Sequence, residues 1–140
     1  MRILFVFTTL IFVCNFSLAN IIKPNPDINP KEVIEIQLNA LKSNDNPFIN
    51  AGIEQTWEFA HPFNRQYTGP LKRFIKMMYS PAYSKMINHQ DFNIIFVSNK
   101  DDISYYFIEL IDKSGDEYGF QWTVQKVLID GKYKNCWMTI

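Results

Sequence analysis

The sequence has too few cysteines and histidines for most familiar site chemistries. Of 140 residues only two are cysteine and two are histidine, and the five glycines are scattered along the chain. No Cys-x-x-Cys pair, His-Glu-x-x-His motif or glycine-rich phosphate loop is present. These absences argue against a metalloenzyme, a nucleotide hydrolase and a thiol protease. We therefore expect neither a metal ion nor another cofactor.

The chain also lacks an excess of charge of one sign. It carries 14 basic and 14 acidic residues, so it has no global field that would attract nucleic acid or an anionic membrane. A local basic cluster contains Arg65, Lys72, Arg73 and Lys76. The solvated face of a helix explains this cluster, and we expect no nucleic-acid partner.

A long apolar run occurs only at the start of the sequence. Arg2 precedes a mainly apolar segment, residues 3–16, and Ser17-Leu18-Ala19 places small residues after it. This order predicts a secretory signal peptide over residues 1–19, cleaved after Ala19, and a periplasmic or secreted mature protein without a membrane anchor. The alternative is an uncleaved anchor, but a membrane-spanning helix needs roughly 20 apolar residues and this run is shorter.

Cleavage would leave Cys136 as the only thiol, because Cys14 lies within the predicted signal peptide. No internal disulfide could then form. The apolar residues around Cys136 predict a buried, unreactive thiol in a strand rather than a nucleophile. An apolar core must hold the fold instead, and 47% of the chain is hydrophobic.

The first half of the mature chain shows helical patterns. Prolines predict an extended, loosely held lead-in over residues 20–29. Helices are predicted over residues 30–43, 51–59 and 70–78, where apolar residues recur at helical spacing. Asn29, Pro30 and Glu32 form the N-terminal capping signature of the first of these helices.

From residue 91 the apolar pattern alternates. Strands are predicted over residues 92–98, 103–112, 118–129 and 133–140. Alternation in the second strand places Glu109 on the same face as Tyr105 and Phe107, where a buried carboxylate would need a partner. Asp130-Gly131 predicts a two-residue hairpin with positive φ at Gly131.

Helices followed by antiparallel strands predict one α+β domain over residues 30–140. In this arrangement the N-terminal helices pack on one face of a curved antiparallel sheet of about four strands. The sheet can wrap around the long first helix, and a conical hollow is left between the two.

Several short motifs lie between residues 35 and 89, with one more near the end of the chain. They are Gln37-Leu38, Ala40-Leu41, Ala51-Gly52-Ile53, Thr56-Trp57, Phe59-Ala60, Pro62, Asn64, Thr68-Gly69-Pro70-Leu71, Arg73-Phe74, Pro81-Ala82-Tyr83, Asn88-His89 and Cys136-Trp137-Met138. Together they resemble an uncharacterised domain family of bacterial and plant proteins with the nuclear-transport-factor-2-like fold. The resemblance implies a conical helix-on-sheet fold, and it implies no catalytic residue.

Polar aromatic and basic side chains are concentrated in the segment that contains most of these motifs. Aromatic residues with a polar tip suit a pocket for a small amphipathic ligand. The predicted ligand-binding residues are Trp57, Tyr83 and Trp122, which would line or floor the cone, and His61, Arg65 and His89, near its polar mouth. The alternative is that the aromatic rings pack in the core and that both histidines cap backbone groups.

Two classes of function follow from this reading. The favoured class is a non-catalytic binding or assembly module, in which the cone holds a ligand or the sheet forms a homodimer. The alternative is a small enzyme similar to the ketosteroid isomerases and dehydratases with this fold, which need a carboxylate or histidine base in the cone. Glu58, Asp91 and Glu109 are the carboxylates nearest to apolar elements, but their spacing matches no such enzyme motif.

Overall fold

The first helix begins where its capping residues predict. The computed structural model describes residues 20–140, and the predicted signal peptide lies outside the described residues. Helix α1 (Pro30–Lys42) follows Asn29, whose side-chain oxygen accepts a hydrogen bond from the backbone N–H of Glu32 at 2.9 Å. Its apolar stripe, which includes Ile34 and Leu38, is fully buried and forms the centre of the core.

Three further α-helices and one short 3-10 helix precede the sheet. They are α2 (Ala51–Glu58), α3 (Pro62–Thr68), α4 (Leu71–Met78) and η1 (Ser84–Met86). Helices α2 and α4 confirm the predicted second and third helices, whereas α3 was not predicted. No residue of α3 is buried, so the helix has no apolar stripe by which the sequence could reveal it.

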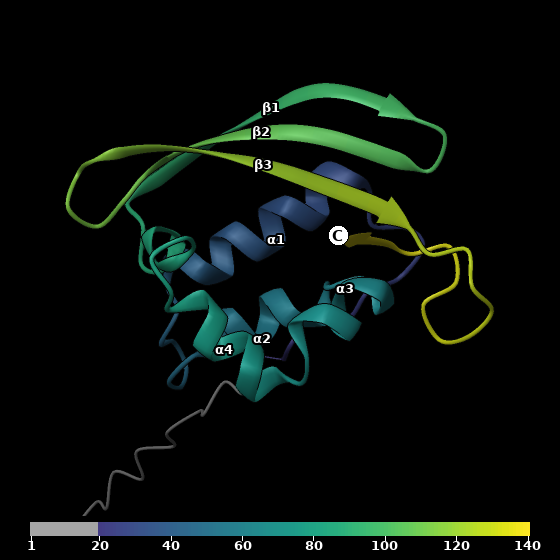
Figure 1. Cartoon of the computed structure of the whole chain (residues 1–140), viewed down its shortest axis with the longest axis horizontal. Coiled ribbons are helices and arrows are strands. Elements are labelled where there is room, and N and C mark those ends of the chain that lie inside the picture. The colour runs from purple at the N-terminus through teal and green to yellow at the C-terminus, as the bar shows by residue number, and fades with distance from the viewer. Residues whose placement is uncertain (1–19) are drawn as a thin grey trace, which may run out of the picture.

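The second half of the chain forms a four-stranded antiparallel sheet in sequence order. Its strands are β1 (Asp91–Lys100), β2 (Ile103–Ile111), β3 (Glu117–Lys126) and β4 (Trp137–Thr139). Figure 1 shows β1 to β3 lying across α1, with α2, α3 and α4 on the other side of α1. The predicted α+β class and strand number are confirmed. The sheet is not strongly curled.

The faces of β2 are opposite to the prediction. Tyr106, Ile108 and Leu110 point into the core, whereas Phe107 and Glu109 are exposed on the outer face. The strand is apolar on both faces, so alternation alone does not say which face is buried, and a shift of one residue exchanges the two. Glu109 therefore has no need of a buried partner, and it accepts a hydrogen bond from the exposed Asn93 at 3.0 Å.

The predicted two-residue hairpin at Asp130-Gly131 is wrong. The Val127 N–H donates to the Cys136 carbonyl oxygen at 2.9 Å, and residues 128–135 form a longer loop between β3 and β4. Gly131 does have positive φ, at 140°, but Asn135 also adopts positive φ and helps to close the wider turn. The predicted inward alternation of β3 accordingly stops before Leu128, which is exposed.

The lead-in is extended as predicted, but it is not loosely held. The side chain of Gln55 accepts a hydrogen bond from Ile22 N–H at 2.7 Å and donates one to the Ile22 carbonyl at 2.9 Å. Lys23 forms an ion pair with Glu58 at 2.7 Å, and Ile28 is buried. Polar side chains of α2 thus fix the segment, and these partners are too distant in sequence for the proline pattern to reveal them.

Cys136 is buried, as predicted. It packs with Val127 and Met138 in a small second apolar cluster, and burial raises the pKa of its thiol, which reduces its reactivity. Within residues 20–140, no helix has the length and apolar character to cross a membrane. The same part of the chain contains no cluster of side chains suited to a metal ion.

Candidate functional site

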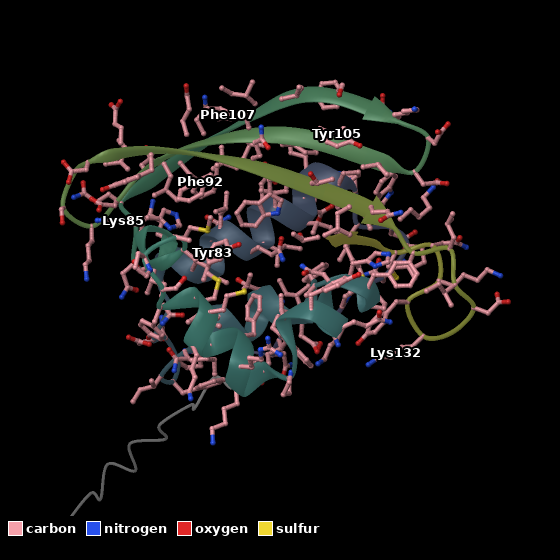
Figure 2. All side chains as sticks on the ribbon, viewed as in Figure 1. Tyr83, Lys85, Phe92, Tyr105, Phe107 and Lys132 are labelled. Carbon is pink, nitrogen blue, oxygen red and sulfur yellow. The ribbon has the colours of Figure 1, made fainter. Side chains whose placement is uncertain are left out.

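A cavity of about 380 Å³ lies between the sheet and the helices. It exists because β4 pairs only with Val124 to Lys126 of β3, so the earlier part of β3 borders an opening toward α3 and α4. Figure 2 shows Tyr83 in this opening. The lining residues are Gln37, Thr56, Ala60, Asn64, Thr68, Phe74, Met77, Met78, Tyr83, Met86, Gln121, Trp122, Thr123, Thr139 and Ile140.

The inner wall of the cavity contains a series of hydrogen bonds that links Trp122, Thr139, Gln37 and Thr56. Trp122 Nε1 donates to Thr139 Oγ1 at 3.2 Å, and that hydroxyl donates to Gln37 Oε1 at 2.6 Å. Gln37 Nε2 then donates to the Thr56 carbonyl at 3.0 Å. Because each of these polar groups has a hydrogen-bond partner, the bonds hold the Trp122 ring and the Gln37 amide in place without any ligand.

The rest of the cavity combines an apolar interior with a polar mouth. Met78, Met86 and Phe74 are buried in it, and methionine side chains adapt readily to the shape of a bound molecule. Tyr83 is exposed at the opening. Its hydroxyl group is therefore accessible to the polar end of a ligand.

Two of the six predicted ligand-binding residues, Tyr83 and Trp122, line this cavity. Trp57 and Arg65 do not. The Arg65 guanidinium lies 4.0 Å above the Trp57 ring, and it donates to the carbonyls of Trp57, Glu58 and Ala60 at 2.8 to 3.0 Å. Arg65 thus caps the carboxyl end of α2, and its predicted position at the mouth of the cavity is wrong.

This capping role predicts a large effect on stability. Arg65→Ala leaves three carbonyl groups without their charged donor, so we expect it to lower the free energy of unfolding by about 2 to 3 kcal/mol. Arg73→Ala is the matched control, because Arg73 is exposed on α4, and it should change stability by less than about 0.5 kcal/mol. Urea denaturation of both variants tests the prediction. Equal stability of the two would show that the carbonyls find other donors.

The two histidines are buried rather than placed at the mouth. His61 is 1% exposed and its Nδ1 accepts a hydrogen bond from Phe63 N–H at 3.2 Å, which caps α3. His89 is 2% exposed and its Nδ1 lies 2.7 Å from the Met86 carbonyl oxygen. The predicted mouth position is therefore wrong for both, and the alternative, that they cap backbone groups, is confirmed.

Burial makes both histidines sensitive to acid. It is the main cause that lowers the pKa of His61 and of His89, so the folded chain favours the neutral rings. The stability that depends on neutral rings is complete above about pH 6.5, the ordinary histidine pKa, and is lost as the pH falls below it. We therefore expect the free energy of unfolding to decrease on acidification through this range.

A single substitution separates this effect from the titration of carboxylates. The side-chain oxygen of His61→Asn can still accept from Phe63 N–H but does not titrate. The variant should lose less stability than the wild type when urea denaturation is compared at neutral and mildly acidic pH. A pH dependence identical to that of the wild type would contradict a contribution from His61.

The three carboxylates considered for catalysis lie outside the cavity. Glu58, at the end of α2, forms an ion pair with Lys23. Asp91 is exposed at the start of β1, and Glu109 is on the outer face of the sheet. Among the lining residues the only ionisable side chain is that of Tyr83. The arrangement thus offers shape, apolar surface and hydrogen bonds, and it places no side-chain carboxylate or imidazole against a bound molecule.

Sequence reasoning missed Gln37 and Thr139 as residues of the site. A signal for Gln37 was present, because a polar side chain on the apolar side of a helix needs a buried partner. The partner lies 102 residues away, and nothing local in the sequence identifies it.

Comparisons of the chain with models of known protein families, with curated proteins and with solved structures give no match. The resemblance to the nuclear-transport-factor-2-like domain family therefore stays a prediction. The evidence for the candidate site therefore comes from its geometry alone.

Proposed function

We propose that this protein binds a small, neutral, mainly apolar molecule in the cavity between β3 and helices α1 to α4. The observation that carries the proposal is the lining itself, an apolar interior with polar groups at the mouth and no charged side chain. The volume is within the range of small-molecule sites. An anionic ligand would have to leave water without a basic side chain to pair with it, which is strongly unfavourable.

The mode of binding follows from the two parts of the lining. The apolar end of the ligand packs against Trp122 and the methionines, and its polar end reaches Tyr83 at the mouth. The hydrogen-bonded wall from Trp122 to Gln37 stays unchanged on binding, because its groups are already paired. This is a binding function, in which the chain recognises a molecule and does not transform it.

A pair of aromatic probes that differ in charge tests this proposal. Naphthol has an apolar bicyclic body and one neutral hydroxyl, and naphthalene sulfonate has the same body with a negative charge. We expect naphthol to bind in calorimetric titration and the sulfonate to bind about tenfold more weakly or not at all. Equal affinity for the two, or no binding of naphthol, would contradict the proposal.

A matched pair of variants locates the binding. Met77→Trp places a larger side chain against the cavity and should weaken naphthol binding by about tenfold. Lys76→Trp adds the same ring at the neighbouring exposed position of α4 and should leave the affinity unchanged. If both variants bind as the wild type does, the probe occupies another site.

The proposal includes the fold type and the place of action. The motif resemblance and the position of α1 under the sheet support a nuclear-transport-factor-2-like arrangement with an open sheet. The charged start, apolar run and small-residue exit of residues 1–19 support export.

Export predicts a defined mature start. Protein recovered from an exporting host should have the intact mass of a chain that begins at Asn20, because the small residues before it suit a signal peptidase. A membrane-bound product that retains Met1 would contradict export with cleavage.

A further inference from the structure

The outer face of the sheet carries an apolar patch that none of the described elements covers. We define the outer patch as Ile95, Val97, Tyr105 and Phe107, which are 38 to 59% exposed. The strand register aligns Ile95 with Phe107 and Ser98 with Tyr105, so the patch is continuous across β1 and β2. Figure 2 shows Phe107 on the side of the sheet away from α1. Contiguous apolar surface of this kind marks a contact site.

Phe107 forms a ridge between two hollows on this face. One hollow, of about 490 Å³, lies toward Asn93, Glu109 and Gly119, and the other, of about 420 Å³, lies toward Tyr105 and Thr123. The ring leans over Gly119, where an added Cβ would lie 2.5 Å from the ring. A surface with a ridge beside hollows can pack against a second copy of itself, ridge into hollow.

The charges on the outer face are divided between its two ends. Glu109 and Glu117 lie at the end where β2 finishes and β3 begins, and both are exposed. Lys100 lies at the opposite end, aligned with Ile103 of β2 on the outer side. The outer patch lies between them, so Lys100 at one end is opposite in charge to Glu109 and Glu117 at the other.

This division decides how two copies can face each other. A two-fold axis parallel to the strands would place the acidic ends together, which like charges disfavour. A two-fold axis across the strands reverses the strand direction and brings Glu109 toward Lys100 of the partner subunit. The apolar patches then meet at the centre of the contact, and the charges lie around them.

We propose that the protein forms a homodimer through the outer face of its sheet, with a two-fold axis that runs across the strands. The contact is independent of the proposed cavity ligand, because the cavity opens on the other side of the sheet. The partner copy supplies the apolar cover that residues 20–140 of one chain do not give to Phe107 and Tyr105. It also pairs Glu109 with Lys100 of the partner subunit twice, once on each side of the axis.

Analytical ultracentrifugation of the purified protein tests the dimer. The wild type should show concentration-dependent dimerisation, and Phe107→Glu should be monomeric at the same concentrations. Phe63→Glu is the matched control, because Phe63 is an exposed aromatic residue on α3, and it should dimerise as the wild type does. Circular dichroism checks that both variants are folded. A monomeric wild type, or a dimer that survives Phe107→Glu, overturns the proposal.

Charge reversal tests the direction of the axis. Lys100→Glu and Glu109→Lys should each weaken self-association by about tenfold, since each places like charges together on both sides of the axis. An equal mixture of the two variants should dimerise as the wild type does, because both contacts in the mixed dimer then join opposite charges. If the mixture associates no better than either variant alone, the proposed pairing is wrong.

Discussion

Gly52→Ala is expected to lower the free energy of unfolding by about 3 kcal/mol or more. An added Cβ at Gly52 would lie 2.9 Å from Asn44 Cα, and closer still to the backbone carbonyl of Ala40. These are main-chain atoms of α1 and its end, so the two helices would have to separate. Helix propensity acts in the opposite direction, because alanine is favoured over glycine within a helix by about 1 kcal/mol. Any measured loss therefore comes from this contact.

Gly131→Ala is the matched control for this prediction. Gly131 has positive φ, and nothing lies within 4 Å of an added Cβ. The substitution should cost only the conformational penalty, about 1 kcal/mol. Urea denaturation measures both variants. If Gly52→Ala is no less stable than Gly131→Ala, α1 and α2 do not require their close approach.

Trp122→Ala should lower the free energy of unfolding by about 3 to 5 kcal/mol. Trp122 is only 7% exposed, and its ring packs in the main core while also lining the cavity. The substitution removes this packing and leaves Thr139 without the hydrogen bond from the indole.

Trp122→Phe separates these two contributions. It keeps most of the apolar area but has no N–H group, so its cost should be closer to that of one hydrogen bond and some lost packing, about 1 to 2 kcal/mol. Urea denaturation of both variants tests the order. A loss below about 1 kcal/mol for Trp122→Ala would contradict the placement of the ring in the core.

The sequence predicts an element correctly where the contacts that fix the element join residues close together in the sequence. Helix α1 was predicted to within one residue because Asn29, Pro30 and Glu32 lie next to its first turn. The hairpin at Asp130-Gly131 was wrong because the closing pair, Val127 and Cys136, lies outside the turn signal. The faces of β2 were exchanged because apolar residues occur on both of them.

The same reasoning applies to the candidate site. Tyr83 and Trp122 line the cavity because large aromatic side chains border apolar hollows in most arrangements of such elements, and their role in ligand binding stays a prediction. His61 and Arg65 were misplaced because their partners are backbone groups of their own neighbourhood. A polar side chain that binds nearby backbone cannot be distinguished by sequence pattern from one that awaits a ligand.

The attachment of β4 to the first half of the chain has a consequence for biosynthesis. Thr139 N–H donates to the Phe59 carbonyl, His61 N–H donates to the Thr139 carbonyl, and the Thr139 hydroxyl donates to Gln37. The wall that closes the cavity therefore forms only after residue 139 has left the ribosome. Contacts so distant in sequence also form slowly, because a long loop must close first. Under the proposed export, the nascent chain would reach a translocation channel before this wall has formed.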